Sequence, residues 1–174
     1  MKPAGTATSY EDYPSWIVLI ATLQQLSIFV IGAYLMGLLG LPWLIAYLVY
    51  LIWLELRLLR KSCVNCYYYG RRCAFGQGKL CSLFFRKGDP NAFLSHSLSW
   101  KDMLPDFLVS LVPFLVGIIL LVRQFSWTVV ALLVLLFLLT SLGNGFVRGS
   151  LACSHCRQLE LGCPAEQLFK KRKK

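Results

Sequence analysis

Residues Trp16 to Met36 read WIVLIATLQQLSIFVIGAYLM, a stretch of 21 residues without a charged side chain. The hydrocarbon core of a bilayer is about 30 Å thick and takes roughly 20 helical residues to cross. Backbone N–H and C=O groups in lipid need partners within the protein, and a helix provides them within one segment. The stretch also lacks the alternation of apolar and polar residues that is typical of a membrane barrel strand. It therefore predicts a transmembrane helix.

Three further apolar runs predict three more spans, at residues 41–59, 107–122 and 127–147. The segments GLLGLP (37–42) and RQFSW (123–127) separate the two members of each pair, and segments of this kind are typical of tight turns. Hydrophobic residues make up 57% of the chain and charged residues only 15%, against about 25% charged residues in soluble domains.

We therefore expect an all-α membrane protein whose four transmembrane helices form two repeated hairpins, residues 16–59 and 105–147. An N-terminal segment (1–15) precedes the first hairpin. A cysteine-rich loop (60–104) joins the hairpins, and a cysteine-rich basic tail (148–174) follows the second one.

The basic residues are distributed unevenly around the predicted spans. The net charge is +10, with nine Lys or Arg residues in segment 57–104, seven in segment 148–174, and Arg123 alone at the opposite side. Cytoplasmic loops carry the excess of Lys and Arg, so we expect a multi-pass inner-membrane protein with both termini in the cytoplasm. Its basic face should attract anionic lipid headgroups. The sequence has no nucleic-acid-binding motif, and we expect no nucleic-acid partner.

A three-cysteine pattern, C-x2-C-x6-C, occurs twice outside the apolar runs. The first trio lies in CVNCYYYGRRC (63–73) and the second trio in CSHCRQLELGC (153–163), ninety positions later for each cysteine. Both trios follow a predicted hairpin and precede a Leu-Phe pair with basic residues. We therefore expect an internal duplication, with residues 16–87 and 105–172 related by rotation about the membrane normal.

Metal ligation explains the two trios most directly, because the cysteines of a C-x2-C pair can reach one ion. Tetrahedral zinc takes four ligands, so seven cysteines and one histidine would fill two sites. The first site would consist of four cysteines: Cys63, Cys66, Cys73 and Cys81. The second site would consist of three cysteines and a histidine: Cys153, Cys156, Cys163 and His96. Cys81 would return across a flexible AFGQGKL loop, and His96 is preferred to His155 because His155 lies between two ligands.

Three alternatives remain for the cysteines. An iron–sulfur cluster is one, since Cys163 is followed by proline as in bacterial ferredoxins, although the full ferredoxin spacing is absent. A cytosolic C-x-x-C pair can also carry out thiol–disulfide exchange, but no thioredoxin-like unit surrounds either pair. The cysteines could finally be free or structural.

Other positions carry more local expectations. Residues 88–106 predict a short interfacial helix on the cytoplasmic surface. Tyr10, Tyr13 and Trp16 predict an aromatic belt at the membrane interface. Gln24, in the middle of the first span, should form hydrogen bonds between helices. Glu55, the only acid in a predicted span, should pair with an arginine.

These observations favour a structural role. The metal sites would hold short cytoplasmic loops that have no core of their own, and the resulting basic platform would bind a membrane-protein or cytoplasmic partner. One alternative is an electron-transfer protein with iron–sulfur clusters, and another is a metal or small-solute transporter with a cytosolic thiol capture site. The sequence has no catalytic triad, phosphate-binding loop or dinucleotide motif, so it does not indicate an enzyme.

Overall fold

The computed structural model of the chain describes residues 9–90 and 100–163. Within these residues four helices are long and apolar enough to cross a membrane: Ser15–Leu38, Leu41–Asn65, Lys101–Arg123 and Trp127–His155. The all-α fold is thereby confirmed, as are four helices of the length and composition predicted for membrane spans. Residues 91–99, which include His96 and the middle of the predicted interfacial helix (88–106), lie outside the described residues, as do residues 164–174 of the basic tail.

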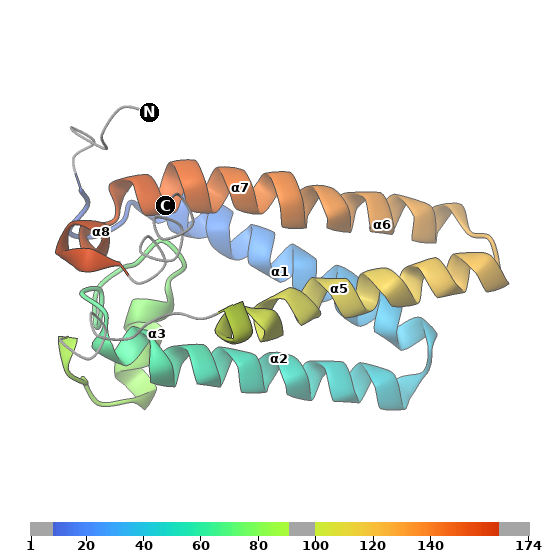
Figure 1. Ribbon diagram of the computed structural model, residues 1–174, viewed down its shortest axis with the longest axis horizontal. Helices are drawn as coiled ribbons and strands as arrows, with labels where there is room; N and C mark the ends of the chain where they lie inside the picture. Colours follow the sequence, from blue (N-terminus) through green and yellow to red (C-terminus); the bar gives the residue numbers. More distant parts are fainter. Residues whose placement is uncertain (1–8, 91–99, 164–174) are drawn as a thin grey trace.

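The long helices form two antiparallel pairs (Figure 1). Helix α1 (Ser15–Leu38) turns into α2 (Leu41–Lys61), and α5 (Trp100–Arg123) turns into α6 (Trp127–Leu138). Both turns lie at one end of the bundle, and the short helices α3 (Gln77–Phe84) and α8 (Arg157–Gly162) lie at the other. We call this second end, formed by residues 62–90 and 147–163, the cysteine-rich end.

The turn between α1 and α2 takes its shape from two residues. Gly40 has φ 125°, a region that side chains with a Cβ rarely enter, and its N–H donates to the Gly37 carbonyl at 3.0 Å. Pro42 follows in the first turn of α2, where its missing N–H costs no helical hydrogen bond. The predicted tight turn is therefore confirmed.

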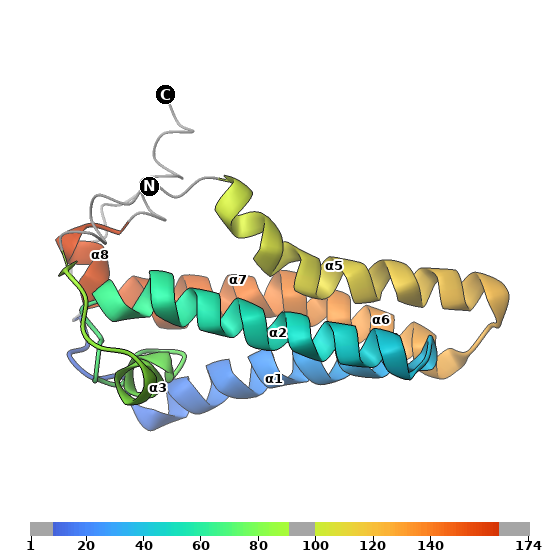
Figure 2. The ribbon, with the colours of Figure 1, turned by 90° about the horizontal axis from the view of Figure 1, so that it is seen from below.

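All four long helices contribute to one buried apolar cluster. Its members are Ile28, Ile31, Leu35 and Met36 on α1, Tyr47, Leu51 and Leu54 on α2, Val109 on α5, and Val129, Leu133 and Leu136 on α6. Helix α1 contacts the other three long helices, and α5 contacts α6. Figure 2 shows the first turns of α5 bending away from the rest of the bundle.

Three helices meet at Tyr47, where a proline shapes the contact. Pro113, inside α5, has no N–H, so it cannot donate the helical hydrogen bond to the carbonyl of Val109, four residues earlier. The Tyr47 hydroxyl donates to that carbonyl at 3.0 Å. On α1, Gly32 leaves room for this hydroxyl, because a Cβ at residue 32 would overlap it. A tyrosine from α2 thus satisfies the backbone group that the proline exposes.

The fourth span departs from a regular α-helix toward the cysteine-rich end. After α6 come a π-helical segment (Leu139–Gly143), the short helix α7 (Asn144–Phe146) and a second π-helical segment (Val147–Ala152). Gln24 Nε2 on α1 donates to the Leu139 carbonyl at 3.0 Å and lies 3.5 Å from Asn144 Oδ1. The expectation that Gln24 links neighbouring helices is confirmed.

The outer faces of the helices are also apolar. Exposed residues occur along every long helix, for example Leu19 and Val30 on α1, Ile52 on α2, Ile119 on α5 and Phe137 on α6. Scattered exposed apolar side chains are normal in soluble proteins, but continuous apolar surfaces along all helices are not. An apolar exterior of this kind suits a multi-pass membrane protein.

Candidate thiol site at the cysteine-rich end

The two C-x2-C pairs adopt the same local structure. Cys63–Asn65 and Cys153–His155 each form a single 3₁₀ turn. The N–H of Cys66 donates to the Cys63 carbonyl at 3.3 Å, and the N–H of Cys156 donates to the Cys153 carbonyl at the same distance. We call these turns the first and second knuckle. Cys63 and Cys153 lie in the last turns of the second and fourth candidate spans, so each knuckle begins directly where its helix ends.

A reciprocal pair of hydrogen bonds joins the knuckles. The N–H of Tyr67 donates to Gln158 Oε1 at 2.8 Å, and the N–H of Arg157 donates to the Tyr68 hydroxyl at 3.0 Å. The offset of ninety positions relates Tyr67 to Arg157 and Tyr68 to Gln158. In each loop, one residue (Tyr67 or Arg157) donates its backbone N–H to the other loop. The side chain of the next residue (Tyr68 or Gln158) accepts the N–H that comes from the other loop.

The two loops share a small core that contains thiols from both trios. Its buried members are Tyr13, Ile17, Tyr68, Ala74 and Ala152, and Cys66, Cys73 and Cys156 pack against it. The sequence-predicted ligands of the two halves are thus brought to one region. None of the seven cysteines forms a disulfide within the described residues.

Burial controls the acidity of the knuckle thiols. Burial raises the pKa of Cys66 to about 11, against the weaker opposing effect of the hydrogen bond from the Tyr68 N–H. Burial likewise raises the pKa of Cys156, where the N–H groups of Gln158 and Leu159 oppose it. Both thiols are therefore protonated at neutral pH in the metal-free chain, unlike the activated, low-pKa cysteines of thiol–disulfide enzymes.

Cys81 lies on a helix and not after a flexible loop, so that expectation is wrong. The last four residues of the predicted AFGQGKL loop belong to helix α3, which begins at Gln77. A hydrogen bond from the N–H of Gly70 to the Gly78 carbonyl, at 3.0 Å, holds the start of this helix against the preceding loop. Cys81 is fully buried and its thiol donates to the carbonyl of Leu59 on α2 at 3.7 Å. Its role as a fourth ligand remains a prediction.

The side chains do not form a ready metal site. In residues 9–90 and 100–163, no group of three His, Cys, Asp or Glu side chains is arranged so that it could hold an ion. One partial contact does exist, since the N–H of Gly78 donates to Cys73 Sγ at 3.4 Å, as N–H groups do to metal-bound thiolates. The structure thus gathers the cysteines without setting their sulfurs in a coordination geometry.

The N-terminal segment is a part of this site that sequence reasoning missed. Tyr13 is 1% exposed, and its hydroxyl donates to the Ala152 carbonyl, while its N–H donates to the Arg72 carbonyl at 3.0 Å. The N–H of Tyr10 donates to the His155 carbonyl, and the Tyr10 carbonyl accepts from the Tyr68 hydroxyl at 2.6 Å. Tyr13 is therefore a core residue and not a lipid-facing one, because the segment crosses both loops and ties them together. The interfacial role of Tyr10 and of Trp16, which is 54% exposed, stays a prediction.

Glu55 also differs from the expectation. Its carboxylate accepts a hydrogen bond from Gln77 Nε2 at 2.7 Å and makes no ion pair with an arginine in the part of the chain that the structure describes. The reason is the position of α3, whose first residue, Gln77, lies against α2 and occupies the place beside the Glu55 carboxylate. The Gln77 side chain also lies 3.9 Å from Cys63 Sγ, so it links the helix end to the first knuckle.

Comparisons of the chain with protein-family models, with curated proteins and with solved structures found no match. The chemistry of this end therefore has to be argued from the residues themselves. The relevant features are seven cysteines, two knuckles of the same structure, and a small buried core with aromatic side chains between them.

Proposed function

We propose that this chain is a multi-pass membrane protein whose cysteine-rich end binds zinc through the two knuckles and presents a basic platform to a protein partner. The single observation that carries the proposal is the reciprocal hydrogen bonding between Tyr67 and Gln158 and between Arg157 and Tyr68. These bonds place two like C-x2-C turns next to each other, and a C-x2-C turn is a common way to supply two thiolates to one ion.

Zinc is preferred because a structural ion would supply what these loops lack. Their shared core has only five buried side chains, too few to hold two loops and the N-terminal segment by apolar contacts alone. A structural zinc ion contributes directly to folding free energy. Binding would turn the thiols of each trio toward one point through side-chain rotation, with Zn–S distances of about 2.3 Å.

The proposed ligands follow the two halves. Cys81 would join the first trio, because α3 brings it close enough to Cys73 and Cys63 to interact with their thiols electrostatically. The second trio would take His96 or another donor as its fourth ligand. The same reasoning supports a duplication of residues 16–87 and 105–172, since both halves have a helical hairpin, a knuckle at its end, and equivalent hydrogen-bonding positions.

The platform role rests on basic side chains that aromatic rings hold in place. The guanidinium of Arg71 lies 5.0 Å from the ring centre of Tyr67 and donates to its hydroxyl at 2.7 Å. Arg148 lies 5.1 Å from the ring centre of Phe75. Such cation–π contacts order the charge without neutralising it, which suits binding to an acidic partner surface. By the distribution of Lys and Arg, this face lies in the cytoplasm, above anionic lipid headgroups of the inner membrane.

Metal analysis of the full-length protein, purified without oxygen, tests the proposal. We expect about two zinc ions per chain by the ligand arithmetic of tetrahedral sites, and no visible absorbance. Cys63→Ser and Cys153→Ser should each lose one ion. The matched control is Ser154→Ala, which alters an exposed side chain inside the second knuckle and should keep both ions.

Two other outcomes are informative. Iron with sulfide and a visible band that bleaches on reduction would replace zinc by an iron–sulfur cluster and favour electron transfer. Protein that holds no metal, but is as stable as its Cys63→Ser variant, would contradict the proposal.

A further inference from the structure

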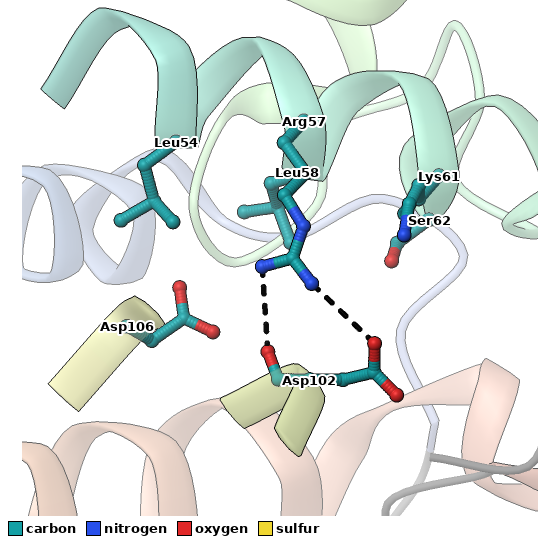
Figure 3. A pocket seen from close by; sticks show the side chains of 7 residues that line it. All are labelled: Leu54, Arg57, Leu58, Lys61, Ser62, Asp102 and Asp106. Carbon is teal, nitrogen blue, oxygen red and sulfur yellow. Dashed lines mark hydrogen bonds and ion pairs between the residues drawn. The ribbon is translucent and has the colours of Figure 1, made fainter. Parts of the chain in front are cut away.

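A charged cleft lies between α2 and α5 at the cysteine-rich end, apart from the thiols. Its volume is about 70 Å³, and its lining residues are Leu54, Arg57, Leu58, Lys61, Ser62, Asp102 and Asp106. Figure 3 shows the polar groups of α2 on one wall and the two carboxylates of α5 on the other. The first turns of α5, which bend away from the bundle in Figure 2, carry both of these acids.

The charges of the cleft are only partly paired. Arg57 forms an ion pair with Asp102 at 3.4 Å and also lies 3.5 Å from the Asp102 carbonyl oxygen. The Asp106 carboxylate makes no direct hydrogen bond or ion pair within residues 9–90 and 100–163, although Arg57 and Arg148 lie close enough to interact with it electrostatically. The amino group of Lys61 likewise has no such partner among these residues. The cleft thus offers one cation and one anion to a ligand.

The cleft lies at the depth of the lipid headgroups. Arg57 follows Leu41, the start of α2, by 16 residues, which corresponds to about 24 Å of helix. Asp106 precedes Arg123, the end of α5, by 17 residues, or about 26 Å. Both residues are therefore near the edge of a hydrocarbon core about 30 Å thick. Leu104 and Phe107, on either side of Asp106, are 56% and 58% exposed and would face acyl chains.

We infer that this cleft binds the headgroup of an aminophospholipid, a lipid with a phosphate and a primary amine such as phosphatidylethanolamine. Lys61 and the Ser62 hydroxyl would bind the phosphate, as cationic and hydroxyl groups do. The Asp106 carboxylate would accept hydrogen bonds from the ammonium group. Asp102 would act as a positioning residue, because its ion pair holds Arg57 against the wall of the cleft.

The pattern of charges favours this class of lipid over its rivals. An anionic lipid such as phosphatidylglycerol would satisfy Lys61 but would give the Asp106 carboxylate no N–H donor. Arg57 and Arg148 act on this carboxylate only at longer range, so its direct hydrogen bonds would still be missing. Phosphatidylcholine has no N–H group to donate to Asp106. The apolar flanks of the cleft favour a membrane lipid over a soluble molecule with the same headgroup.

Native mass spectrometry of the full chain, delipidated in mild detergent, tests the inference with three lipids at equal concentration. We expect phosphatidylethanolamine to bind about tenfold more tightly than phosphatidylcholine, because only its ammonium group can donate charge-assisted hydrogen bonds to Asp106. Asp106→Asn should remove this preference, and Lys61→Gln should weaken binding of all three lipids. Glu11→Gln and Lys79→Gln, which alter exposed charges outside the cleft, should change neither result.

Several results would overturn the inference. These are equal binding of phosphatidylethanolamine and phosphatidylcholine, tighter binding of phosphatidylglycerol, or an unchanged preference in Asp106→Asn. Glycerophosphoethanolamine, which lacks acyl chains, should not displace the lipid at the same concentration. Displacement by it would mean that the cleft takes a soluble ligand.

Discussion

The backbone N–H of Tyr67 donates a hydrogen bond to the side chain of Gln158, a residue 91 positions later in the chain, at 2.8 Å. Gln158 is 6% exposed, the one buried polar residue among the side chains that the structure describes. Its counterpart in the first half, Tyr68, accepts the equivalent hydrogen bond from Arg157. A buried side chain that accepts a hydrogen bond from a backbone N–H of the other loop fixes how the two loops meet, because a backbone N–H inside a protein contact needs a partner.

Replacing Gln158 should therefore loosen the contact between the loops. We expect Gln158→Ala to lower the free energy of unfolding by about 1–3 kcal/mol, the cost of leaving a buried donor without a partner. Thermal unfolding in detergent, followed by circular dichroism, would measure the change. Gln124→Ala, at an exposed site in the turn between α5 and α6, is the control. A shift no larger than that of the control would show that the bond does not hold the loops.

The contact between Tyr47 and Val109 allows a sharper test inside the membrane. Tyr47→Phe should cost about 1 kcal/mol, in the range measured for hydrogen bonds between membrane helices, because the Val109 carbonyl loses its donor. Pro113→Ala should restore the helical N–H that bonds to this carbonyl. In the Pro113→Ala background, Tyr47→Phe should therefore cost clearly less, and a double-mutant cycle of unfolding free energies would measure the coupling. Additive effects would refute this explanation of the contact.

Gly32 should tolerate no side chain. A Cβ at residue 32 would overlap the Tyr47 hydroxyl, so Gly32→Ala should destabilise the bundle by about 1–3 kcal/mol, as overpacking does. Gly37→Ala is the matched control on the same helix, because the nearest atom to its added Cβ would be 3.9 Å away. The difference between the two unfolding midpoints is the relevant quantity. Equal midpoints for Gly32→Ala and Gly37→Ala would show that the contact between Gly32 and Tyr47 can adjust to a methyl group without loss of stability.

The orientation can be tested through the thiols. Because segments 57–104 and 148–174 carry sixteen of the basic residues, a membrane-impermeant maleimide should leave the cysteines of intact cells unlabelled. It should label the exposed Cys153 once the membrane is opened and a chelator has removed bound metal. A Gln124→Cys variant, with the new thiol at the opposite end, should be labelled in intact cells. The reverse pattern would place the cysteine-rich end outside and revive structural disulfides.

The spans could be predicted from the sequence because lipid imposes a simple rule on length and polarity, and Trp16 to Met36 obeys it without exception. The like spacing of the cysteines likewise anticipated two like knuckles. Tyr13 was misplaced because a tyrosine before a span is ambiguous, and only the loops that fold over it distinguish a core from an interface. The partner of Glu55 and the segment that leads to Cys81 could not be predicted for a related reason. Both depend on α3, whose eight residues give too weak a periodic signal to predict.

The assignment of Cys81 as a ligand gives the most decisive test of the first metal site. Its thiol is fully buried and donates to the Leu59 carbonyl, which a purely structural cysteine could also do. If Cys81 completes the site, both Cys81→Ser and Cys81→Ala should lower the zinc content from about two ions to about one, as four-ligand sites require.

If Cys81 only fills space, Cys81→Ala should keep both ions and cost a small amount of stability. Zinc analysis and thermal unfolding of the two variants, each compared with Cys63→Ser, separate these cases. We expect loss of one ion, because α3 holds Cys81 against the end of α2, the helix that leads directly into the first knuckle. Full zinc content in Cys81→Ser would instead show that Cys81 is no ligand and favour a site shared by the six cysteines of the two trios, of which Cys66, Cys73 and Cys156 pack against the same buried core.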